Sequence, residues 1–230
     1  MNEFLLNATY FGMVLSVGCY LIGVWCRKRF KLSIFNPLLI AVVLIMALLL
    51  VLDIDYETFN QGAQYLTYLL TPATVCLAIP LYEQISLLKK HAVAVLAGVA
   101  CGVLSCLGSI WLLSVLFGLS HEQYVTLLPK SITTAIGMGV SDELGGITTI
   151  AVAAIILTGI LGNIIAERVL KLFHIEDKIA RGLAIGTASH AIGTTKAMEM
   201  GRIEGAMSSL SIAVAGLMTV LAATVFSYFY

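Results

Sequence analysis

Two short polar segments lie within an otherwise apolar chain, and their residue types could bind a small anion. A lysine and several hydroxyl groups can stabilise a carboxylate that has left water. A histidine, with an ordinary pKa of about 6.5, can take up a coupling proton near neutral pH. We therefore predict a substrate-binding group made of Lys130, Ser131, Thr133, Thr134, Gly137, Ser189, His190, Gly193 and Thr194.

Simpler roles for the charged members of these segments stay open. Lys130 follows Pro129 and could instead extend its amino group to the membrane interface. His190 could be a structural histidine held by a hydrogen bond. For the flanking carboxylates, solvation or an ion pair with Lys196 or Arg202 is favoured over catalysis; these carboxylates are Asp142, Glu143, Glu199 and Glu204.

The two polar segments also resemble each other. Residues 131–147 and 187–203 align without gaps at an offset of 56, and six of the seventeen positions are identical. Each copy directly precedes a long apolar stretch, and the charge distribution described below makes the two copies enter the membrane from opposite faces. This arrangement is typical of the inverted repeats of secondary transporters, whose broken helices hold the substrate.

The composition of the segments suits such broken helices. Irregular backbone is tolerated in a bilayer only where it is buried in protein or lines a water-filled cavity. At the N-termini of half-helices, the free N–H groups carry partial positive charge and favour an anion. Glycine lets the backbone turn and approach a ligand closely, which motivates Gly137 and Gly193 as site residues.

The elements that must position these residues are membrane helices. Hydrophobic residues make up 60% of the chain and charged residues 11%, which is too few to cover a water-soluble globule. Thirteen basic and thirteen acidic residues cancel, so nothing indicates nucleic-acid binding. The long apolar runs do not alternate in polarity as membrane β-strands do. We predict an all-α, polytopic transmembrane helical bundle surrounded by lipid.

Six charge-free runs are long enough to cross the bilayer, namely 4–26, 32–52, 58–82, 91–121, 144–166 and 205–230. Basic residues gather in three loops, which the positive-inside rule assigns to the cytoplasm: 27–31, 83–90 and 167–181. All three basic loops lie on the cytoplasmic side if each of the six runs crosses the membrane once and the two polar stretches return to the side that they left. A pair of broken crossing helices would also place them there.

We interpret residues 1–230 as one integral membrane domain. Residues 1–65 would form scaffold spans and 66–230 a core, with substrate-lining broken segments at 66–82, 123–143 and 182–203. The ridge Ala94, Gly98, Gly102 and Cys106, small at every fourth position, is interpreted as helix packing. No Cys or His spacing typical of a metal site is present, so we expect no metal, no cofactor and no enzymatic activity.

Several motifs together resemble the LrgB/CidB family of membrane proteins. They are Leu128-Pro-Lys-Ser-Ile-Thr-Thr-Ala-Ile-Gly137, Leu144-Gly-Gly-Ile147, Thr187-Ala-Ser-His-Ala-Ile-Gly-Thr194, Glu204-Gly-Ala-Met-Ser-Ser209 and Thr71-Pro-Ala-Thr-Val-Cys-Leu-Ala-Ile-Pro-Leu81. The resemblance covers essentially the whole chain.

The resemblance implies a multi-pass protein of the bacterial inner membrane. Members of that family include antiholin-like regulators of murein hydrolases, bacterial pyruvate transport components and the carboxyl-terminal part of the plastid glycolate/glycerate transporter. It also implies a homo-oligomer and a small LrgA/CidA-like membrane partner. Clustered polarity favours a transporter component for small monocarboxylates such as pyruvate, lactate, glycolate or glycerate. A holin-like or antiholin-like regulator of autolysis is the alternative.

Overall fold

The computed structural model describes residues 9–30, 35–69, 72, 75–76, 82 and 85–230 of the chain, and within these ranges every regular element is a helix. This confirms the predicted all-α class. The helices form two compact units, Met1–Leu77 and Ala78–Tyr230. The predicted single domain, with its boundary between scaffold and core after residue 65, stays a prediction.

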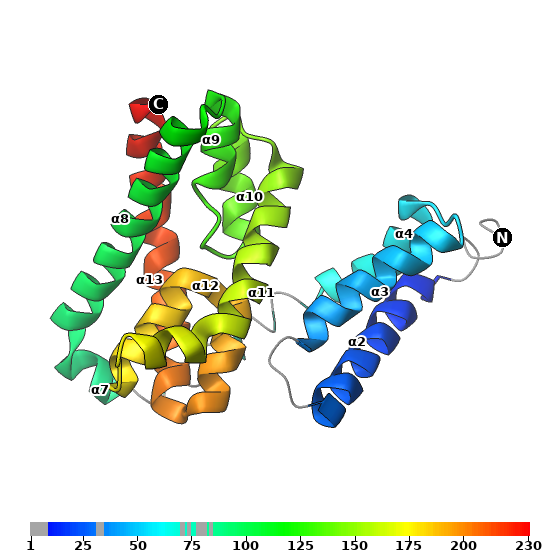
Figure 1. Cartoon of the computed structure of the whole chain (residues 1–230), viewed down its shortest axis with the longest axis horizontal. Helices are drawn as coiled ribbons and strands as arrows, with labels where there is room; N and C mark the ends of the chain where they lie inside the picture. Colours follow the sequence, from blue (N-terminus) through cyan, green and yellow to red (C-terminus); the bar gives the residue numbers. More distant parts are fainter. Residues whose placement is uncertain (1–8, 31–34, 70–71, 73–74, 77–81, 83–84) are drawn as a thin grey trace. The chain divides into compact units, whose positions relative to one another are not determined.

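Unit 1 contains α2 (Phe11–Phe30), α3 (Pro37–Val51) and α4 (Tyr56–Thr67) (Figure 1). The Asn36 side chain caps α3 by accepting the amide protons of Leu38 and Leu39 at 2.9 and 3.3 Å, which satisfies backbone groups that a helix start leaves free. Gly23 of α2 lies so close to the start of α3 that a Cβ there would stand 2.6 Å from the Pro37 carbonyl oxygen.

Unit 2 contains the polar segments, and its elements follow one another with short connections. They are α7 (Ile85–Lys90), α8 (Ala92–Phe117), α9 (His121–Leu127), α10 (Thr134–Glu143), α11 (Thr148–Leu172), α12 (Lys178–Met200), α13 (Arg202–Phe226) and the 3-10 helix η1 (Ser227–Phe229). The main core of unit 2 gathers buried apolar side chains of α8, α9 and α13, with Leu128 and Ile132 between α9 and α10.

Four helical segments in the described residues are long and apolar enough to cross a membrane: α2, α8, α11 and Arg202–Phe229. In contrast, α3 has 15 residues and would rise only about 22 Å, short of the roughly 30 Å of a hydrocarbon core. Of the predicted span 58–82, α4 covers the first part, and the predicted broken segment 66–82 lies mostly outside the described residues. Six full spans therefore remain a prediction.

Both polar segments contain an interruption of the helix, and at the offset of 56 the two interruptions lie next to each other in the alignment. In the first, residues 128–133 separate α9 from α10, which begins at Thr134. In the second, α12 is broken at His190, whose φ of 41° and ψ of −141° are not helical. Thr134 and His190 are aligned in the repeat. Each interruption is followed by a short helical stretch and then by a 25-residue helix, α11 or α13.

The two 25-residue helices run in opposite directions with respect to α9. The amide of Ile147, just before α11, donates to the Thr126 hydroxyl of α9 at 2.8 Å. The Tyr124 hydroxyl, also in α9, donates at 2.8 Å to the carbonyl of Phe226, the last residue of α13. The beginning of α11 and the end of α13 therefore lie at the same end of unit 2 (Figure 1). This direction is compatible with the inverted repeat, which stays a prediction.

Candidate functional site

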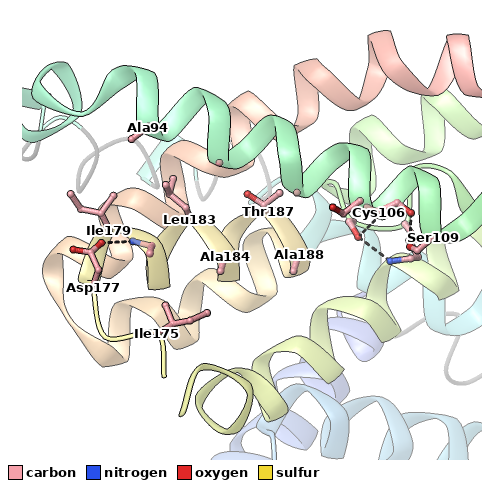
Figure 2. A pocket seen from close by; sticks show the side chains of 16 residues that line it. Ala94, Cys106, Ser109, Ile175, Asp177, Ile179, Leu183, Ala184, Thr187 and Ala188 are labelled. Atoms are coloured by element: carbon pink, nitrogen blue, oxygen red, sulfur yellow. Dashed lines mark hydrogen bonds between the residues drawn. The ribbon is translucent and has the colours of Figure 1, made fainter. Parts of the chain in front are cut away.

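A cavity of about 730 Å³ lies in unit 2 between α8 and the first half of α12 (Figure 2). From α8 it is lined by small or hydroxyl-bearing side chains: Ala94, Gly98, Gly102, Ser105, Cys106 and Ser109. From α12 and the residues before it, the lining is Ile175, Asp177, Ile179, Ala180, Leu183, Ala184, Thr187 and Ala188. Lys130 and Ser131, from the interruption between α9 and α10, complete it.

Lys130 and Ser131 form a group of hydrogen-bonded polar side chains in the cavity lining. The Lys130 ammonium donates to the Ser131 hydroxyl at 3.1 Å, and the Cys106 thiol lies 3.3 Å from the same hydroxyl. Ser131 is buried, whereas Lys130 is half-buried. A lysine ammonium has three protons, so Lys130 keeps donors for a bound anion after its bond to Ser131.

The other charged group of the cavity is acidic. Asp177 is the N-cap of α12, and its Oδ1 accepts the amide proton of Ala180 at 2.8 Å. The lining thus contains one cationic and one anionic side chain. Asp177 is exposed, so water and salt screen its charge.

The ridge of small residues on α8 has two roles, of which sequence reasoning identified only packing. A Cβ at Gly102 would stand 2.7 Å from Cγ2 of Thr187, so close approach of the helices requires glycine there. A Cβ at Gly98 would have Cδ1 of Leu183 as its nearest neighbour, at 3.7 Å. All four members of the ridge also line the cavity. Its four-residue spacing was the available signal, because small side chains leave room for a ligand as well as for a helix.

Three predicted site residues of the first segment lie beside the cavity lining rather than in it. Thr133 is the N-cap of α10 but makes no side-chain capping bond, and both Thr133 and Thr134 are half-buried. Gly137 is buried within α10, where a Cβ would meet the Ile155 side chain and would stand 3.3 Å from the Pro129 carbonyl oxygen. The structure thus gives Gly137 a packing role inside a helix, not the turn for which we predicted it.

Polar groups of the second segment form hydrogen bonds within the protein. His190 is buried, and its Nε2 lies 3.0 Å from the carbonyl oxygen of Ile155 in α11. The Thr194 hydroxyl donates to the His190 carbonyl at 2.9 Å and lies 2.7 Å from the Ser208 hydroxyl of α13. His190 is absent from the lining of the cavity at Lys130. The structure therefore does not bring Lys130 and His190 into one cavity.

Ser189 and Gly193 also lie on the buried side of α12. Ser189 lines a smaller cavity of about 140 Å³ between α11 and α12. A Cβ at Gly193 would stand 3.2 Å from Cγ2 of Ile185 and would also meet the Ser189 side chain. As with Gly137, close packing within a helical segment accounts for the glycine, which corrects the predicted turn.

An ion-pair cluster joins the second half of α12 to α11. The Lys196 ammonium lies 2.9 Å from a carboxylate oxygen of Glu167 and 3.5 Å from one of Glu199. The ion pair predicted for Glu199 with Lys196 is present. Asn163 of α11 adds hydrogen bonds to the Ile192 carbonyl and the Thr195 hydroxyl at 3.0 and 2.9 Å. In the described part of the chain, no three His, Cys, Asp or Glu side chains gather as a metal site would require.

Helices that are long and apolar enough to cross a membrane define a helical membrane protein. The family model described as the LrgB-like family matches residues 16–229, and the chain belongs to this family. The resemblance that the motifs indicated is confirmed.

The curated relatives cover almost the whole chain. "Uncharacterized protein YwbG" of Bacillus subtilis (strain 168) is 38% identical over 211 residues, which are 92% of this chain and 94% of the relative. "Antiholin-like protein LrgB" of Bacillus mycoides (strain KBAB4) is 35% identical over 221 residues, 96% of each chain, and its namesake in Bacillus cereus (strain B4264) matches equally. No solved structure shows significant similarity.

Proposed function

We propose that this protein is a transporter component for small monocarboxylates of the pyruvate, lactate, glycolate and glycerate class. The observation that carries the proposal is the cavity that includes Lys130 at the interruption between α9 and α10. The volume of about 730 Å³ falls within the range of small-molecule sites and leaves space for a three-carbon acid together with water.

The charge of the lining supports a monocarboxylate. A carboxylate that leaves water must regain several charge-assisted hydrogen bonds, and the ammonium of Lys130 with the hydroxyl of Ser131 supplies donors of this kind. Among the described residues, Lys130 is the one cationic side chain of the lining, which matches a ligand with a single carboxylate.

The interrupted helices support movement of the ligand across the membrane. In secondary transporters, broken helices from two inverted repeats meet near the midplane, and one repeat moves against the other. The interruptions at 128–133 and at His190, which are adjacent in the alignment of the repeat, and the opposite directions of α11 and α13 fit that plan. We place the protein in the bacterial inner membrane as a multi-pass chain, with loops 27–31, 83–90 and 167–181 in the cytoplasm.

A second candidate function is an antiholin-like regulator of murein hydrolase activity, which the names of the two LrgB relatives favour. The two functions are compatible, because a change in carboxylate flux alters the energetic state of the membrane and could change lysis indirectly. Association into a homo-oligomer and with a small LrgA/CidA-like partner belongs to either function and is likewise a proposal.

Uptake of labelled pyruvate and glycolate into proteoliposomes tests the transport function. Wild-type protein should accumulate at least one of them, and an imposed proton gradient should increase the accumulation if transport is coupled to protons. The matched control is the Lys130→Met variant, which should insert and fold but accumulate little. If correctly folded wild-type protein accumulates neither acid in either condition, the regulatory function replaces transport.

A further inference from the structure

The helix α12 reverses its direction at His190 and forms a hairpin. A Cβ at Gly193 would stand 3.3 Å from the carbonyl oxygen of Ile185, which lies eight residues earlier in the chain. Eight residues of a continuous helix rise about 12 Å, so residues 185 and 193 can approach this closely only if the chain folds back. The interruption at His190 is the tip of the hairpin, and residues 178–189 form its first arm.

Both ends of the hairpin lie at the beginning of α13. In the first arm, a Cβ at Gly182 would meet the carbonyl oxygen of Glu204. In the second arm, Met198 is a close neighbour, because its Cα would lie 3.2 Å from a Cβ at Gly205. The base of the hairpin is therefore at the end of unit 2 that carries the loop 167–181, opposite to the end where α9 contacts the last residue of α13.

The cavity follows the first arm from the base toward the tip (Figure 2). At the base, Ala94 and Asp177 line it, and both residues are exposed. At the far end, Cys106, Lys130 and Ser131 line it. The twelve residues of α8 from Ala94 to Cys106 rise about 18 Å. The cavity is thus longer than a three-carbon acid and connects the polar group at Lys130 with the base of the hairpin.

Buried side chains separate Lys130 from the opposite end of unit 2. Tyr124 and Val125 of α9 are fully buried, and the exposed fraction of Leu128 is 1%. None of these three residues lines the cavity. The Tyr124 hydroxyl also donates at 2.8 Å to the carbonyl of Phe226 and thereby holds α9 against the end of α13. The cavity therefore ends at this layer.

We propose that the cavity is a half-channel, a path that is open at the base of the α12 hairpin and closed beyond Lys130. Water and a small anion enter it from the side of the membrane that carries the loop 167–181. The layer of Tyr124, Val125 and Leu128 closes the other side, and passage across the membrane requires this layer to separate from its neighbours. The inference rests on the proposed function for the identity of the anion, but the side of access is independent of it.

Sided labelling with a membrane-impermeant methanethiosulfonate that carries a sulfonate group tests the half-channel. Each variant has a single cysteine in the full-length protein whose five native cysteines are replaced by alanine. The test positions line the cavity along the first arm and are exposed, namely Ala180→Cys, Ala184→Cys and Ala188→Cys. Glu176→Cys, exposed in the loop before α12, marks the side of the membrane. Leu104→Cys is the matched control, since it is 54% exposed on α8 but lies outside the lining.

Reagent on the side that modifies Glu176→Cys should modify all three test positions, and reagent on the other side should modify none of them. Leu104→Cys should react from neither side, because a thiol that faces lipid stays protonated and the thiolate is the nucleophile. Reaction of every variant in denaturing detergent verifies that its thiol is intact. Modification of Ala188→Cys from the opposite side, or from neither side, would overturn the half-channel, as would equally fast reaction of Leu104→Cys and Ala184→Cys.

Added pyruvate or lactate separates this inference from the proposed function. A bound acid should slow the modification of Ala188→Cys, which lies nearest to the tip of the hairpin among the three test positions, while Glu176→Cys should react at the same rate with and without acid. Sided labelling as expected without an effect of any acid would support the half-channel and count against monocarboxylate transport.

Discussion

The two interruptions of unit 2 lie next to each other in the alignment of the repeat, yet they are surrounded by opposite kinds of chemistry. The interruption at 128–133 presents Lys130 and Ser131 to a cavity that a ligand can enter. The interruption at His190 is buried, and the ring and the neighbouring Thr194 are bonded to Ile155 and Ser208 of adjacent helices. The two copies of the repeat thus share an interrupted helix but differ in their side chains. Those of the first copy line a cavity, and those of the second copy form hydrogen bonds with adjacent helices.

The largest expected effect is the loss of stability on substitution of His190. His190→Val removes the bond to the Ile155 carbonyl and places a β-branched side chain at a φ of 41°. Such a conformation is strongly unfavourable for β-branched residues. We expect the free energy of unfolding to fall by about 3 kcal/mol, measured as a lower thermal midpoint in detergent.

The control for this prediction is Ala191→Val, at the next residue, which follows the interruption and is half-buried. It should lower stability by less than about 1 kcal/mol, since the penalty there is mainly helix propensity. Similar thermal midpoints for His190→Val and Ala191→Val would show that neither the bond of His190 to Ile155 nor its positive φ contributes to stability as proposed.

Filling the cavity should eliminate uptake with little change in folding. A Cβ at Gly98 has its nearest neighbour at 3.7 Å, so the backbone admits a side chain, and Gly98→Leu directs it into the lining. We expect monocarboxylate uptake below about a tenth of the wild-type rate, as tenfold corresponds to 1.4 kcal/mol. Gly108→Leu on the same helix is the control, because no atom lies within 4 Å of its added Cβ. Full uptake by Gly98→Leu would place the substrate path elsewhere.

A smaller effect is expected where a neutral donor near the cation is removed. Ser131→Ala should weaken binding of a monocarboxylate about fivefold, which corresponds to about 1 kcal/mol, the usual contribution of one hydrogen bond. The Lys130 ammonium, which donates to Ser131 at 3.1 Å, remains for the carboxylate. The affinity is determined by equilibrium dialysis with labelled acid. An effect as large as that of Lys130→Met would mean that Ser131, rather than the charge, determines binding.

The smallest effect is expected at the ion-pair cluster of Lys196, which follows the interruption at His190. Lys196→Met removes the pairs with Glu167 and Glu199, whose side chains are 43% and 44% exposed. Because exposed pairs contribute little, the free energy of unfolding should fall by about 1 kcal/mol or less, and the decrease should shrink at high salt. Ligand affinity should stay unchanged; a tenfold loss would connect this cluster to the binding site.

Sequence reasoning was successful where residue type alone decides the outcome. Low charge and long apolar runs indicated helices. The charge distribution and the repeat indicated re-entrant or broken helices at 123–143 and 182–203, and the structure has an interruption in each. Lys130 and Ser131, predicted from their chemistry, line the cavity.

Sequence reasoning was less successful where the outcome depends on which neighbour a helix face meets. His190 faces α11 rather than the cavity, whereas Thr187, three residues earlier, lines it. The backbone interruption at His190 changes the direction of this side chain and of those that follow, and helical periodicity cannot predict that change. The length of α3 was also overestimated, since hydropathy does not register that Asn36 and Pro37 start the helix late.

Binding of one labelled monocarboxylate to wild type, Lys130→Met and His190→Gln, measured side by side, tests the difference between the two interruptions most directly. If the interruption at 128–133 binds the anion, Lys130→Met should weaken binding between about tenfold and a hundredfold, as expected for loss of a hydrogen bond between charged groups. This loss should appear at every pH between about 5.5 and 8, and His190→Gln should stay within about twofold of wild type. Unchanged affinity in Lys130→Met, or a tenfold loss confined to His190→Gln, would contradict the account.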